Sequence, residues 1–198
     1  LEESISTLLT TLKSNQKFAK LLIFTLNSLQ GFISPPNKEI NINSSIIMKL
    51  GGIDILHLIT VNNINKDDIL SLSGDIFYKL ISINDIFDKE LTKIFAEKNG
   101  HKAIIDIMLK RKKAKDDILL LPFIKITNAL AQLPQLIPNL IENNIIESIN
   151  LNFDEDSNGL KYDKNNLQTK LNVLKQISTS KIGRAYSFIR IRYNRKYM

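Results

Sequence analysis

The chain has 198 residues, 43% of them hydrophobic, and a formal net charge of +7 at pH 7. Its longest apolar stretches fall short of the roughly 20 residues that a membrane-spanning helix needs, so no transmembrane segment is predicted. Cysteine is absent, which excludes disulfides, thiolate metal ligands and thiol nucleophiles and favours a reducing, cytoplasmic setting.

The first residues give no sign of a signal peptide. Leu1 is followed by Glu2 and Glu3, where a signal peptide would carry a basic region before an apolar core. We therefore expect no signal peptide, and we expect the chain to be a piece of a longer protein.

An internal repeat of about 49 residues is the most informative pattern in the sequence. The run Lys-Asp-Asp-Ile-Leu at 66–70 recurs at 115–119, and the same shift places Gly51 on Gly100. A further step of 49 reaches Lys164, and a step back reaches Lys17. The pattern predicts about four units.

Each unit shows the apolar spacing of helices. In the best-defined unit, one apolar helix precedes Asn99-Gly100 and another follows it. We expect Gly51, Gly100 and Asn144 to take the left-handed conformation that ends one helix and begins the next. The aspartate pairs Asp67-Asp68 and Asp116-Asp117 are expected to cap a further helix.

Helices that cannot bury their apolar faces alone predict a core that runs from unit to unit. We expect one domain over 1–198 with units at about 1–44, 45–90, 91–135 and 136–189, followed by a basic aromatic tail at 190–198. No strand is expected in the middle of the chain. The alternative is an ordinary helical bundle in which the repeated glycines and aspartates are coincidence.

Three segments resemble the armadillo repeat, with the related HEAT repeat as second choice: Ser45 to Ile59, Leu91 to Met108 and Leu136 to Ile149. Each has a short helix, a glycine or asparagine break and an apolar second helix. The resemblance implies an all-α fold, a right-handed α-solenoid of about four armadillo-type repeats. It also implies a third helix in each unit, which we place at Phe24 to Leu29, Ile76 to Ile83, Ile126 to Leu133 and Leu171 to Ile177.

In armadillo proteins the third helices line a groove that binds protein segments, and those that hold basic peptides present tryptophan and asparagine four residues apart. The matching pairs in this chain are Phe24 and Ser28, Tyr78 and Ser82, Asn128 and Gln132, and Asn172 and Gln176. Tryptophan is absent and no second position is asparagine, so nuclear-import-receptor activity is not expected. The alternative is that these side chains form a solvated helix face.

Two basic segments stand out. Lys110, Arg111, Lys112, Lys113 and Lys115 are expected to form an exposed loop between helices, although such a run can also serve as a nuclear localisation signal or contact an acidic partner. The last 18 residues hold six basic residues and no acidic one, interleaved with Tyr186, Phe188, Tyr193 and Tyr197. Arg184, Arg190, Arg192, Arg195 and Lys196 of this segment are the candidate contacts to nucleic acid or an acidic surface, unless the segment merely packs on the last helix.

Little in the sequence favours catalysis or a cofactor. Asp154, Asp156, Asn158 and Gly159 resemble half of a calcium loop, but Asn165 stands where the bidentate carboxylate belongs, so a long acidic loop is favoured over a metal site. The two histidines, His57 and His101, are expected on helix surfaces, and no phosphate-binding glycine loop is present.

The sequence therefore predicts a non-catalytic, cytoplasmic scaffold or adaptor that binds a protein partner through the solenoid surface. The alternative is a module that binds nucleic acid or an acidic cytoskeletal surface through its tail.

Overall fold

The computed structural model describes residues 1–34, 39–111, 117–149 and 164–179. These residues are mostly helical, as the all-α prediction requires. The helices in chain order are α1 (Glu2–Ser14), α2 (Ala19–Phe32), α3 (Ile40–Lys49), α4 (Gly52–Asn62), α5 (Asp67–Leu80), α6 (Lys89–Glu97), α7 (Gly100–Arg111), α8 (Asp117–Ala131), α9 (Ile137–Glu142), α10 (Ile145–Ser148) and α11 (Lys164–Thr179), with a 3-10 turn at Pro134–Leu136 before α9.

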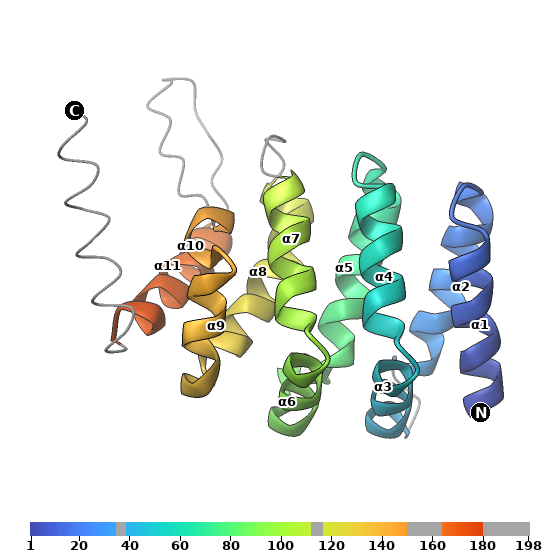
Figure 1. Cartoon of the computed structure of the whole chain (residues 1–198), viewed down its shortest axis with the longest axis horizontal. Helices are drawn as coiled ribbons and strands as arrows, with labels where there is room; N and C mark the ends of the chain where they lie inside the picture. Colours follow the sequence, from blue (N-terminus) through green and yellow to red (C-terminus); the bar gives the residue numbers. More distant parts are fainter. Residues whose placement is uncertain (35–38, 112–116, 150–163, 180–198) are drawn as a thin grey trace.

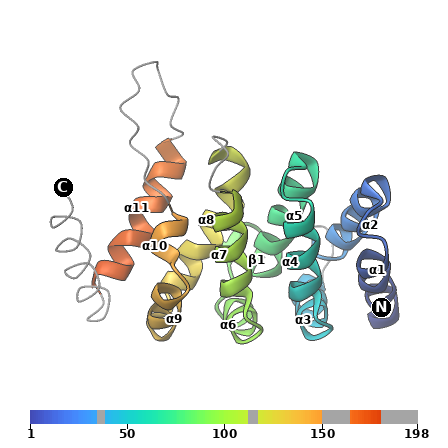
Figure 2. The same ribbon diagram turned by 45° about the horizontal axis from the view of Figure 1, so that its top comes forward.

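The helices lie in three rows along the molecule. Helices α2, α5, α8 and α11 form the third-helix row, in which each contacts the next. Helices α1, α4, α7 and α10 form the second-helix row in the same way and lie in front of the third-helix row in Figure 1. The first-helix row, α3, α6 and α9, runs along one edge in both Figure 1 and Figure 2. Helices about 50 residues apart in the chain are thus neighbours in space.

The core follows these rows from one end to the other. Phe77 of α5 lies edge-on to Phe95 of α6, with ring centroids 6.1 Å apart, and its ring is 6.3 Å from that of Phe123 of α8. All three side chains are completely buried. Gly74 of α5 allows this approach, because a Cβ there would lie 2.9 Å from the Phe123 ring. The aromatic contact therefore joins α5 to both following helices.

Two of the three predicted helix breaks are confirmed. Gly51 has φ +80° before α4, and Asn144 has φ +65° before α10. At the middle break the prediction is wrong, because the left-handed residue is Asn99, with φ +59°, and Gly100 is the first residue of α7. A Cβ on Gly100 would lie 2.3 Å from the Phe95 ring, so this glycine is required for close packing.

The spatial equivalents differ slightly from a uniform shift of 49. Helices α4 and α7 begin at Gly52 and Gly100, a shift of 48, while α5 and α8 begin at Asp67 and Asp117, a shift of 50. A Cβ on Gly52 would lie 2.5 Å from Ile47, just as Gly100 faces Phe95. The start of α8 therefore lies two residues further from the start of α7 than α5 does from α4, so the sequence period averages two different registers.

A small hairpin contradicts two expectations. The helix predicted at Ile76 to Ile83 ends at Leu80, and strand β1 (Ser82–Ile83) pairs antiparallel with β2 (Ile86–Phe87). Asn84 and Asp85 have φ +49° and +63°, the two positive values that a two-residue hairpin turn of this kind needs. The other predicted third helices fall in α2, α8 and α11, with α8 ending at Ala131, before the predicted Leu133.

The aspartates at the start of α5 are placed as predicted but do not cap it. Asp67 and Asp68 lie in the first turn, yet the N-cap residue is Lys66 and no side-chain cap bond is present. Asp67 Oδ1 instead accepts a hydrogen bond from Arg111 Nη2 at 2.7 Å. A side-chain cap does occur at α6, where Asp88 Oδ1 accepts from the Leu91 amide at 2.8 Å. Asp116 and the Asp117 side chain lie outside the described residues.

We predict that Gly100→Ala destabilises the protein by about 1–3 kcal/mol, because the new methyl group forces apart a packed contact with Phe95. Gly31→Ala is the matched control, since nothing lies within 4 Å of a Cβ there and alanine favours the helix. Thermal unfolding followed by circular dichroism measures both variants. Equal unfolding midpoint temperatures for the two variants would contradict the close contact between Gly100 and Phe95.

Candidate protein-binding surface

The first positions of the predicted groove pairs fall on successive helices of the third-helix row. Phe24 on α2 is 69% exposed, while Tyr78 on α5, Asn128 on α8 and Asn172 on α11 are half-buried. Lys125 of α8 places its Nζ 5.4 Å from the centre of the Tyr78 ring, so side chains of neighbouring helices meet on this face. The row offers one surface to which four helices contribute.

The second positions of these pairs do not form an equivalent row. The hydroxyl of Ser28 donates to the carbonyl of Phe24 at 3.0 Å, and that of buried Ser82, in β1, donates to the carbonyl of Tyr78 at 2.8 Å. Gln132 is exposed just after α8, and Gln176 is half-buried on α11. Both serine hydroxyls are bound to their own backbone, so they do not act as an asparagine ladder would.

The hairpin adds an aromatic and charged cluster that the sequence analysis missed. The Tyr78 hydroxyl donates to the carbonyl of Asp85 at 3.1 Å, and its ring lies edge-on to Phe87 at 5.4 Å. Burial and the nearby Asp85 raise the pKa of Tyr78. Asn84 and Asp85, flanked by apolar residues, were the available signal for this hairpin.

An acidic side chain lies next to this cluster. Burial raises the pKa of Asp75 on α5, although the positive charges of Lys79 and Lys125 lower it in part. Lys79 Nζ also donates to Ser34 Oγ at 2.9 Å. Together with Asp85, whose charge acts on Tyr78, Asp75 offsets the two lysines in the middle of the third-helix row.

Helix α2 and the two residues before it carry an exposed apolar surface that was also missed. Phe18 is 66% exposed and Leu21 is 38% exposed, and with Phe24 they are spaced three residues apart. Lys17 and Lys20 beside them are exposed. We name these five residues the α2 patch. The available signal was the spacing of its apolar residues, which is out of phase with the buried stripe Leu22, Leu26 and Leu29.

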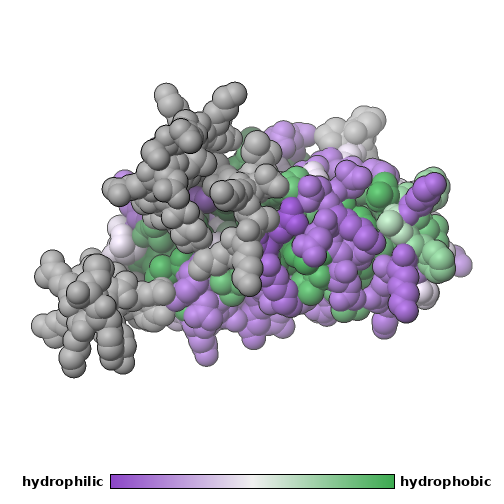
Figure 3. All heavy atoms as spheres, turned by 90° about the horizontal axis from the view of Figure 1, so that it is seen from above, coloured by the Kyte–Doolittle hydropathy of each residue, from purple (hydrophilic) through white to green (hydrophobic). Residues whose placement is uncertain are grey.

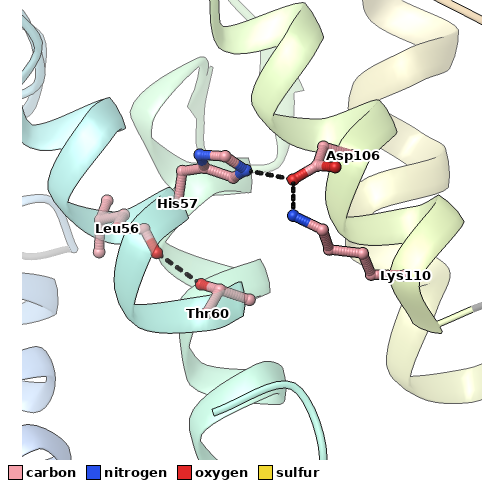
Figure 4. Close-up of polar contacts among 5 residues, drawn as sticks. All are labelled: Leu56, His57, Thr60, Asp106 and Lys110. Atoms are coloured by element: carbon pink, nitrogen blue, oxygen red, sulfur yellow. Dashed lines mark hydrogen bonds and ion pairs between the residues drawn. The ribbon is translucent and has the colours of Figure 1, made fainter. Parts of the chain in front are cut away.

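A polar contact joins neighbouring helices of the second-helix row. His57 Nε2 of α4 lies 2.7 Å from Asp106 Oδ2 of α7, and Lys110 Nζ lies 2.7 Å from the same oxygen (Figure 4). Burial acts to raise the pKa of Asp106, but the hydrogen bonds of Lys110 and His57 outweigh it, so the pKa is lowered. The Nε2 atom of His57 is engaged by a carboxylate, and the contact is a link between helices.

The second histidine is not on the surface, so that expectation is wrong. His101 on α7 is 4% exposed. Burial lowers its pKa, and the carbonyl of Ala96 partly opposes this shift. The histidine residue type alone did not indicate burial. His101 is buried because it follows Gly100 at the start of α7, close to Ala96 of α6.

The basic run contains a structural arginine. Arg111 ends α7 and is 8% exposed, so the expectation of an exposed loop is wrong for this residue. Its Nη1 donates to the carbonyl of Ile64 at 2.8 Å and its Nη2 to Asp67. Lys112, Lys113 and Lys115 lie outside the described residues. Arg111 ties α7 to the connection that precedes α5.

Several predicted sites lie outside the described residues. These are the acidic loop with Asp154, Asp156, Asn158 and Gly159, and the tail residues Arg184, Arg190, Arg192, Arg195 and Lys196. Asn165 falls within α11, but its side chain is not described. In the part of the chain that is described, no group of three or more histidine, cysteine or acidic residues is placed to hold a metal ion.

No described helix alone has the length and apolar composition to cross a membrane, although α3 and α4, bent by 75° at their junction, meet that criterion as a pair. No protein-family model, curated protein or solved structure matches the chain.

We predict that Arg111→Leu destabilises the chain by about 2–3 kcal/mol, because the Ile64 carbonyl and Asp67 lose a charged donor. Lys110→Leu is the control, since Lys110 is 46% exposed in an i,i+4 pair and such pairs contribute about 0.5 kcal/mol or less. Urea unfolding measures both. A loss for Arg111→Leu no larger than that for Lys110→Leu would show that the buried contact is unimportant.

Proposed function

We propose that this chain is a right-handed armadillo-type α-solenoid of about four units, acting as a non-catalytic scaffold or adaptor that binds a protein segment along its third-helix row. The contacts α2–α5, α5–α8 and α8–α11 support this proposal, because equivalent helices of successive units are neighbours. An ordinary bundle has no reason to pair helices at a nearly regular sequence spacing of about 50 residues. HEAT-type units are the second choice.

The observation that carries the proposal is the surface shared by four neighbouring helices. Packed helices lie about 8–10 Å apart, so the row spans roughly 25–30 Å from α2 to α11. An extended segment rises about 3.3 Å per residue, so roughly eight residues of a partner cross the whole row. A repeated helical face of this length provides wide area with little demand on any single residue.

The side chains on this row match the chemistry of a peptide. Asn128 and Asn172 carry amides, the groups that bind a peptide backbone in both directions. Asn172 Oδ1 accepts from Gln168 Nε2 at 3.0 Å, and Asn128 Oδ1 is buried with no hydrogen-bond partner among the described residues, so a bound segment would replace the Gln168 contact. The Tyr78 ring and the exposed Phe24 provide apolar contact. Because Ser28 and Ser82 bind their own backbone and tryptophan is absent, the proposal does not extend to recognition of basic import signals.

Selection from a random library of 12-residue peptides on the immobilised chain tests the proposal. The affinity of the most enriched peptide, measured by fluorescence polarisation, should fall about tenfold or more in the double variant Asn128→Ala, Asn172→Ala, because roughly 1.4 kcal/mol of backbone hydrogen bonding corresponds to a factor of ten.

The matched control is Asp54→Ala, Lys102→Ala, which changes two exposed residues of α4 and α7 in the second-helix row. Its affinity should stay within about twofold of the parent chain, since surface contacts remote from a binding site add little. A larger loss of affinity in the control variant than in the double asparagine variant would place peptide binding outside the third-helix row. If no peptide is enriched at all, the proposal is wrong.

The alternative function, binding of nucleic acid or an acidic cytoskeletal surface, rests on the six basic residues and interleaved aromatic residues of the last 18 positions. It predicts that deletion of residues 190–198 abolishes salt-sensitive binding to a single-stranded oligonucleotide or to microtubules. A chain that binds these polymers equally well after the deletion would rule out this role of the tail, while peptide binding should lose only a little affinity as salt rises.

A further inference from the structure

We propose that the α2 patch anchors an acidic amphipathic segment of the protein partner, with the apolar side chains of the segment on Phe18, Leu21 and Phe24 and its carboxylates near Lys17 and Lys20. This inference rests on the proposed function and specifies the partner that the third-helix row receives.

The apolar part of the patch is larger than helix α2 needs for its own packing. Leu22, Leu26 and Leu29 bury the inner face completely, whereas Phe18 and Phe24 are each about two-thirds exposed. Figure 3, in which the end formed by α1 and α2 lies at the right, shows hydrophobic residues at the surface of this end. Large apolar side chains grouped on one exposed face are typical of an interaction site.

Large exposed apolar side chains elsewhere among the described residues fall on separate elements, such as Ile42 on α3, Ile86 in β2 and Leu171 on α11, whereas three are grouped at α2. On the outer face of α1, Glu2, Glu3, Thr10 and Lys13 are exposed and polar. Along the third-helix row, the positions that follow Phe24 are Tyr78 and the amides Asn128 and Asn172. A partner therefore meets an apolar anchor at α2 and hydrogen-bonding groups beyond it, which suits a polypeptide better than a lipid surface.

The charge of the patch selects an acidic partner. Lys20 lies one helical turn before Phe24 on α2, and Lys17 lies in the turn that precedes the helix. Neither lysine has an ion pair among the described residues. On the next helix, the half-buried Asp75 is already near Lys79 and Lys125. Carboxylates of a partner would neutralise the positive charge of these two lysines. Such charge complementarity speeds association and favours acidic partners over basic ones.

Two acidic side chains near α2 lie on another of its sides. Asp67 and Asp68 line a shallow recess together with Ala19 and Ile23, on the side of α2 that faces α5. Asp67 is bound there by Arg111. These carboxylates therefore do not neutralise the exposed face that carries Leu21 and Phe24.

The test uses two synthetic 14-residue peptides that share leucine and phenylalanine at positions i, i+3, i+4 and i+7, with glutamate at the remaining positions of one and lysine in the other. Fluorescence polarisation with the full chain should show that the glutamate peptide binds about tenfold or more tightly than the lysine peptide. Leu21→Ser, Phe24→Ser should weaken the glutamate peptide about tenfold, whereas Ile42→Ser, which removes a 57% exposed apolar side chain from α3, should not.

Charge reversal tests the electrostatic part. Lys17→Glu, Lys20→Glu should reverse the preference in favour of the lysine peptide, while Lys89→Glu, Lys93→Glu on the exposed face of α6 should leave it unchanged. An unchanged preference in the first variant overturns the inference.

The remaining outcomes separate this inference from the proposed function. If library-selected peptides depend on Asn128 and Asn172 but not on Leu21 and Phe24, the α2 site is refuted and the scaffold proposal stands. If no peptide binds, both fail. Binding of the patch to phosphatidylserine vesicles without peptide binding, or a dimer in sedimentation that Leu21→Ser, Phe24→Ser dissociates, would also overturn the inference in favour of a lipid surface or a second copy.

Discussion

The packing of Phe77 between Phe95 and Phe123 shows the constraint on which the structure depends. Besides the preceding helices α2, α3 and α4, the core of α5 contacts α8 and Phe95 of α6, which come later in the chain, so this group of helices does not close its own core. Each further group of helices buries the apolar face of the preceding group and exposes an apolar face of its own. The three rows follow from this requirement, and so does the wide surface that they share.

The same constraint explains which features the sequence could predict. Helical class, the breaks at Gly51 and Asn144 and the placement of Phe24, Tyr78, Asn128 and Asn172 on neighbouring helices depend on apolar spacing and backbone conformation, which are local. The family and the solenoid subtype stay predictions.

The features that the sequence analysis missed depend on contacts between distant residues. Gly100 is required because the Phe95 ring leaves no room for a side chain there, while the left-handed conformation falls on Asn99. Arg111 looked like one more residue of a basic run, yet Ile64 and Asp67, more than 40 positions earlier, make it a structural residue. The exposed face of α2 was hidden because its apolar residues look like core in a one-dimensional pattern.

Polar contacts also join neighbouring helices on the second-helix side of the molecule. His57 with Asp106 links α4 to α7, and Arg111 links α7 to the segment before α5, so these charges are used within the second-helix side of the molecule. The third-helix row keeps Phe24, Lys17 and Lys20 exposed, with the amides of Asn128 and Asn172 further along. The proposed scaffold rests on this difference between the second-helix row and the third-helix row.

Native-state hydrogen exchange at increasing urea concentration tests the stacking most directly, because it measures the free energy of opening for each helix. A stack held by neighbours predicts that amides of α1 and α2 exchange through openings of lower free energy than those of α5, α7 and α8, which have neighbours on both sides. One shared opening free energy for all of these helices would mean that the chain unfolds as a closed bundle, and would contradict the account.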